Sequence, residues 1–110
     1  MWLSQRSAAS FYNHIDYFKN EIVRNIWSIM DTIDKTYYKF RKPIEVVNNE
    51  EYGSVGLIYG VFYNKEDKSI KFNVTWGRGY SSTPAPWDPT DFMIEDMLNI
   101  LERLEEISCV

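Results

Sequence analysis

The chain has 110 residues, with 16 acidic against 12 basic residues and a net charge of −4, so its length suits one domain and its charge argues against a generic DNA-binding protein. Hydrophobic residues make up 45% of the chain and aromatic residues 16%, which excludes a disordered or low-complexity protein. The single cysteine, Cys109, and the single histidine, His14, exclude a disulfide framework and a multi-histidine metal site.

The first predicted element is a long amphipathic helix over residues 7–38. Its apolar residues recur at steps of three and four and form one stripe about 80° wide: Phe11, Ile15, Phe18, Ile22, Ile26, Ile29 and Ile33. Ser7 or Ser10 suits the N-cap, and Pro43 ends the helix. The negative end of the helix dipole is matched by basic residues: Lys35, Lys39, Arg41 and Lys42.

This helix is too long for a compact domain. Even about 28 of these residues in a helix would span about 42 Å, whereas a chain of about 100 residues has a radius of gyration near 13 Å. Two alternatives follow: a break near Asn20 or Asn25, or an overhanging end whose apolar stripe is covered by a second copy of the chain. A homodimer is therefore one expectation.

Three strands are predicted next, over residues 44–47, 55–63 and 70–76. Alternation assigns the faces of the middle strand: Val55, Leu57, Tyr59, Val61 and Tyr63 lie on one, and Gly56, Ile58, Gly60 and Phe62 on the other. The glycine face is shared by Lys71, Asn73 and Thr75 of the last strand. The glycines indicate either a trough that another backbone could approach or a β-bulge. The last two strands pair antiparallel, because only the residues from Asn64 to Ser69 separate them.

Residues 77–87 show no periodicity and are predicted as an irregular loop stiffened by proline. A second helix follows, with Asp88 as its N-cap and Pro89 at its first position. Its apolar stripe is spaced at three and four residues: Met93, Met97, Ile100, Leu104 and Ile107.

These elements predict a two-layer α+β fold in a single domain over residues 1–110: a helix, three antiparallel strands and a helix, with both helices on one face of the sheet. The order resembles that of double-stranded RNA-binding domains. Those domains grip phosphates with basic residues at the start of the last helix. Here that position is acidic, with Asp88, Asp91, Glu95 and Asp96. The resemblance stops at the order, and we expect no nucleic-acid partner.

The sequence contains no arrangement typical of catalysis. His14 lies at the edge of the helix stripe, where a structural role is typical, and the segment from Gly77 to Gly79 lacks the Gly-Lys-Ser/Thr continuation of a phosphate-binding loop. We therefore expect no enzymatic activity, no cofactor and no metal. The absence of a long apolar run predicts no membrane span, and the unpaired cysteine and lack of a signal peptide favour the cytoplasm.

The first candidate binding surface is the loop that contains Trp76, Arg78, Tyr80 and Trp87. Tryptophan, tyrosine and arginine are the residue types most common in binding hot spots. The alternative is that the two tryptophans close the end of the core.

The second candidate surface is acidic. Asp91, Glu95, Glu102 and Glu106 share the side of the second helix opposite its apolar stripe. Residues 44–110 carry twelve acidic and five basic residues (net −7), whereas residues 1–43 carry four and seven (net +3). Such a field speeds the approach of a basic partner. The alternative is a solvated outer face.

The leading functional hypothesis is a protein-binding domain that acts by stoichiometric occlusion on a partner with a basic surface. Its size and acidity suggest a small inhibitor, immunity or antitoxin-like protein of a phage or mobile element. Two alternatives stay open. One is a small-molecule or peptide-binding domain with a pocket between residues 77–87 and the sheet, and the other is the structural subunit of a homodimer.

Overall fold

The structure is a computed structural model that describes residues 15–46, 55–77 and 83–108. Its elements are helix α2 (Ile15–Ile33), strands β1 (Tyr37–Val46), β2 (Gly56–Asn64), β3 (Ser69–Trp76) and β4 (Ala85–Trp87), the 3-10 turn η1 (Pro89–Asp91) and helix α3 (Ile94–Ser108). The strands form one antiparallel sheet in the order β1-β2-β3-β4. The predicted α+β fold is confirmed, with the short β4 as an additional strand. The predicted caps Ser7 and Ser10, as well as His14, lie outside the described residues.

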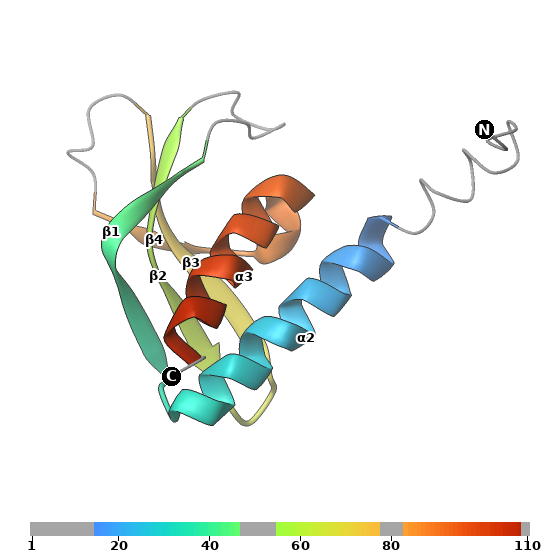
Figure 1. Cartoon of the computed structure of the whole chain (residues 1–110). Helices are drawn as coiled ribbons and strands as arrows, with labels where there is room; N and C mark the ends of the chain where they lie inside the picture. Colours follow the sequence, from blue (N-terminus) through green and yellow to red (C-terminus); the bar gives the residue numbers. More distant parts are fainter. Residues whose placement is uncertain (1–14, 47–54, 78–82, 109–110) are drawn as a thin grey trace, which may run out of the picture.

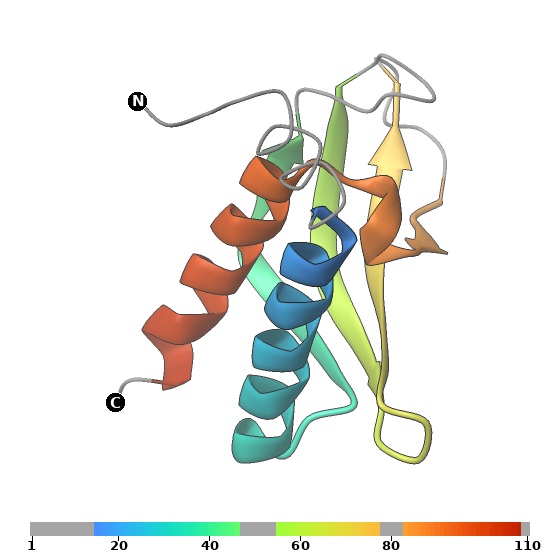
Figure 2. The same ribbon diagram turned by 90° about the vertical axis from the view of Figure 1, so that its right-hand side faces the viewer.

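Both helices cover the same face of the sheet, as predicted (Figures 1 and 2). Helix α3 contacts β1, α2 contacts β3, and the two helices contact each other. Within the described part of the chain, neither helix is long and apolar enough to cross a membrane. The core between the two layers consists of Ile22, Ile26, Met30, Phe40, Ile44, Val46, Ile58, Val61, Tyr63, Ile70, Phe72, Val74, Phe92, Met97, Ile100, Leu101 and Leu104.

Helix α2 ends at Ile33, earlier than predicted, and runs unbroken through Asn20 and Asn25. Asp34 has a left-handed backbone (φ 56°). The N–H groups of Asp34 and Lys35 donate to carbonyl oxygens of the last helical turn, each at 3.2 Å. This is the Schellman motif, in which glycine usually follows the helix. Because aspartate takes that place here, the sequence lacks the usual stop signal.

The residues after Thr36 form strand β1 at the edge of the sheet rather than the end of the helix. The prediction that the basic residues there face the helix dipole is therefore wrong. Lys39, Arg41 and Lys42 lie on β1 and are exposed. Lysine on an edge strand hinders pairing between sheets of different molecules.

A β-bulge at Tyr59 interrupts the sheet. On the side of β2 that pairs with β1, residues 40–43 of β1 lie opposite Tyr59 alone. On the side that pairs with β3, Tyr59 is the extra residue of β2, between Ile58 and Gly60. An extra residue reverses the alternation of side chains, so Ile58 and Val61 both face the core. The predicted continuous alternation is wrong, and the bulge, which was the alternative, is confirmed.

Helix α3 begins at Ile94, later than predicted, because the residues before it form the separate turn η1. Asp88 takes the N-cap position of η1 without a side-chain cap hydrogen bond. Phe92 is extended (φ −108°, ψ 155°) and 1% exposed. Its ring is stacked with Trp76 (centroids 5.6 Å apart) and meets Phe72 edge-on (5.2 Å). Burial of this ring accounts for the break between η1 and α3.

Candidate functional site

The strongest candidate site is a hollow of about 500 Å³ on the face of the sheet opposite the helices. We call it the aromatic groove. It is lined by Thr36, Tyr37, Phe62, Tyr63, Asn64, Ser69, Lys71 and Pro86. Its size falls in the range of about 300–1,000 Å³ that is common for ligand sites. All four strands contribute to it.

The position of the groove follows from the alternation of side chains after the bulge. Phe62 and Lys71 are direct partners on β2 and β3. Each is flanked along its own strand by buried residues that belong to the core. Because neighbouring side chains on a strand point to opposite faces, Phe62 and Lys71 point away from the helices.

The side chain of Tyr37 lies across the sheet, over Gly60. A Cβ atom on Gly60 would overlap the Tyr37 phenol, and the Tyr37 hydroxyl accepts a hydrogen bond of 3.0 Å from Asn73 Nδ2 on β3. The Tyr37 ring also packs against Phe62, with centroids 4.5 Å apart. The half-buried ring is thus held by three residues of two other strands, which makes it a preorganised apolar contact surface.

Lys71 supplies the charged group of the groove. Its Nζ atom lies 3.2 Å from Asp88 Oδ2, and the two side chains are 45% and 55% exposed. An ion pair as exposed as this contributes about 0–1 kcal/mol. Lys71 can therefore exchange Asp88 for another anion at little cost in stability.

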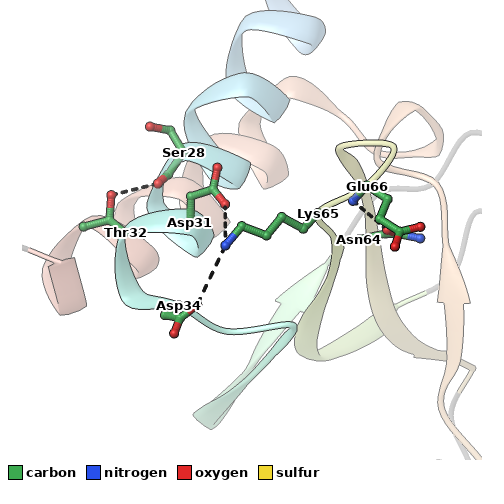
Figure 3. Close-up of polar contacts among 7 residues, drawn as sticks. All are labelled: Ser28, Asp31, Thr32, Asp34, Asn64, Lys65 and Glu66. Atoms are coloured by element: carbon green, nitrogen blue, oxygen red, sulfur yellow. Dashed lines mark hydrogen bonds and ion pairs between the residues drawn. The ribbon is translucent and has the colours of Figure 1, made fainter.

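Polar contacts link the hairpin turn beside the groove to the end of α2 (Figure 3). Lys65 Nζ lies 3.9 Å from carboxylate oxygens of both Asp31 and Asp34, which connects the turn to the end of α2. Within the turn, Asn64 Oδ1 accepts a hydrogen bond of 3.0 Å from the Glu66 N–H. Because the Lys65 pairs are long and exposed, they contribute little to stability, and the groove does not depend on them.

Two groups beside the groove have shifted pKa values. Hydrogen bonds from Ser69 hold the pKa of Asp67 below its usual value. The stabilisation from this carboxylate is therefore present above the unfolded-state pKa and lost as pH falls through the lower folded-state pKa. Burial raises the pKa of Tyr63, and the carboxylate of Asp31 raises it further. At neutral pH, Asp67 is charged and Tyr63 is neutral.

Of the four predicted aromatic loop residues, the structure describes Trp76 and Trp87. Trp76 and Trp87 are half-buried, pack against the core and meet edge-on with centroids 5.7 Å apart. This packing fits the alternative that the tryptophans close the end of the core, and their half-exposed rings leave the predicted binding role a prediction. Arg78 and Tyr80 lie outside the described residues, so their predicted role stays a prediction.

Trp87→Ala is expected to lower the free energy of unfolding by about 2 kcal/mol, less than for a fully buried aromatic residue because Trp87 is only half-buried. Urea denaturation followed by circular dichroism measures this value. The control is Thr83→Ala, an exposed residue of the same segment, which should change stability by less than about 0.5 kcal/mol. Unchanged stability in Trp87→Ala would show instead that its ring does not belong to the core.

The four predicted acidic residues are all exposed, but they do not share one helix. Asp91 lies on η1, whereas Glu95, Glu102 and Glu106 lie on α3. Glu102 and Glu106 line a second hollow, of about 270 Å³, between α3 and β1. Its other lining residues are Ile44, Asn99 and Arg103. Near the start of α3, burial and then the charge of Glu95 raise the pKa of Asp96.

Sequence reasoning found part of the groove and missed its central residue. Strand alternation correctly placed Gly60, Phe62, Lys71 and Asn73 on one face. Tyr37 was assigned to the end of the helix, because no glycine or proline marks the helix end before it. A run of aromatic and basic residues next to a proline, as in residues 37–43, was the available signal for an edge strand.

Among the described residues, no three histidine, cysteine, aspartate or glutamate side chains gather closely enough to hold a metal ion. Comparisons with protein-family models, with curated proteins and with solved structures find no match to this chain. Inferences about its function therefore depend on its own residues.

Proposed function

We propose that this chain is a non-enzymatic protein-binding domain that holds a segment of its partner in the aromatic groove. The observation that supports this most is the position of Tyr37, fixed over Gly60 by Phe62 and Asn73. A partner side chain packing on this ring loses little free energy to ordering it. Aromatic anchors of this kind dominate the affinity of many protein interfaces.

The domain would act by stoichiometric occlusion, as an inhibitor that covers a surface its partner needs. The helices already occupy one face of the sheet, and the groove lies on the other. A bound segment would cross all four strands there without rearranging the core. Complexes of such preorganised surfaces form with little movement of the backbone.

A second contact is proposed at the acidic residues of α3. Glu102 and Glu106 line the smaller hollow beside β1, and Glu95 is exposed on the same helix. A basic surface on the partner would be attracted to them. Charges at the edge of an interface raise the association rate more than the affinity, so this contact assists the groove rather than replacing it.

Site-specific photo-crosslinking tests the proposal. A benzoylphenylalanine at position 62 should yield one crosslinked species of defined mass in cells that naturally produce the protein. The matched control places the same group at position 17, where an exposed tyrosine lies on α2. Adding Tyr37→Ala should abolish the crosslink from position 62, because it removes the ring against which the partner packs. Equal crosslinking from both positions would contradict the proposal.

A further inference from the structure

We infer that the aromatic groove selects a partner segment with a planar side chain followed two residues later by a carboxylate, and that Asp88 takes the place of this carboxylate in the free protein. The inference rests on the proposed function and adds the chemistry of the occupant. It is drawn from the charge of the groove lining, the spacing of its residues and the contacts of Asp88.

The lining of the groove is basic although the protein is acidic and although Asp67 and Asp88 lie beside that lining. Its lining, as far as the structure describes it, contains one lysine and no carboxylate. Lys39 is the direct neighbour of Gly60 on β1 and is exposed, and Lys35 is exposed next to Thr36. A carboxylate on the occupant is therefore complementary to Lys71 in the lining and to Lys39 beside Gly60.

The distance between Phe62 and Lys71 determines how far apart the planar side chain and the carboxylate of the occupant must lie. Lys71 is the direct cross-strand partner of Phe62, and adjacent strands lie about 4.8 Å apart. In an extended segment, alternate side chains share one side and lie about 6.7 Å apart. A planar side chain on Tyr37 and Phe62 thus leaves the residue two places along within reach of Lys71.

Asp88 competes within the protein with an incoming carboxylate for Lys71. It takes the N-cap position of η1 but makes no cap hydrogen bond. Its carboxylate pairs with Lys71 instead, and both side chains of this pair are about half exposed. An incoming carboxylate can replace it without disturbing η1, after which the Asp88 side chain returns to water.

Substitutions of Asp88 and of Lys71 should change the affinity for a peptide with a carboxylate in opposite directions. The probes are the peptides acetyl-Trp-Gly-Glu-amide and acetyl-Trp-Gly-Lys-amide and the oligonucleotide (dT)8, titrated into the full chain and followed by ¹H–¹⁵N NMR. The glutamate peptide should bind more tightly than the lysine peptide. Asp88→Asn should tighten its binding about two- to fivefold, and Lys71→Met should weaken it by a similar factor and remove the preference.

The matched control is an exposed ion pair outside the groove lining, between Lys65 and Asp34. Neither Lys65→Met nor Asp34→Asn should change binding of the glutamate peptide. If both Asp88→Asn and Lys71→Met weaken binding, the pair has a structural role and the inference is wrong. Equal affinity for both peptides in the groove also overturns it and leaves the proposed function standing. No peptide binding in the groove overturns the inference, and the crosslinking experiment then decides the proposed function. Shifts of groove residues by (dT)8 alone would overturn both.

Discussion

Replacing Phe92 by alanine is expected to lower the free energy of unfolding by about 3–5 kcal/mol, a large part of the 5–15 kcal/mol that is typical of a whole domain. The ring is 1% exposed and contacts both Trp76 and Phe72. Its removal leaves a cavity where the segment before α3 meets the sheet. Urea denaturation measures the loss, and tryptophan emission should shift to longer wavelength as water reaches Trp76.

The control for this prediction is Leu98→Ala on α3. Leu98 is 47% exposed, so its truncation should cost less than about 1 kcal/mol. A similar loss from both variants would mean that α3 and the residues before it are sensitive to any truncation. A loss below about 1 kcal/mol for Phe92→Ala would show that its ring does not anchor the helix.

Both helices and the order of the elements were predictable because apolar spacing reflects burial. The stripe that includes Ile22 and Ile26 faces the core, and so does the stripe that includes Met97 and Ile100. The ends of the helices were not predictable in the same way. A local feature sets each one: Asp34 in a left-handed conformation ends α2, and Phe92 in an extended conformation precedes α3.

The candidate site was less accessible to sequence reasoning, because its central contact is not local. Tyr37 and Asn73 are 36 residues apart in the chain, and only the sheet register brings them together. Residue type also does not report how far a side chain is buried. Trp76 and Trp87 are typical of binding surfaces by composition, whereas here they pack against the core. Burial depends on the tertiary structure, which composition does not report.

Gly60→Ala is expected to destabilise the domain by about 1–3 kcal/mol through overpacking and to abolish binding in the groove. The added methyl group would overlap the Tyr37 phenol and the carbonyl oxygen of Tyr38. The Tyr38 carbonyl oxygen has little freedom to move, whereas the Tyr37 side chain is free to change its conformation. The Tyr37 ring must therefore leave its place over Gly60. The hydrogen bond to Asn73 and the contact with Phe62 would be lost with it. Thermal unfolding and the peptide titration measure the two effects separately.

A double-mutant cycle shows whether the Tyr37 ring is the cause. In the Tyr37→Ala background the overlap with the phenol no longer exists, although the overlap with the Tyr38 carbonyl remains. Gly60→Ala should therefore cost less there than in the wild-type chain, with a coupling free energy above about 0.5 kcal/mol. Additive effects would place the ring elsewhere than over Gly60. Because the groove depends on that position, additivity would also remove the main support for a preorganised binding surface on this face of the sheet.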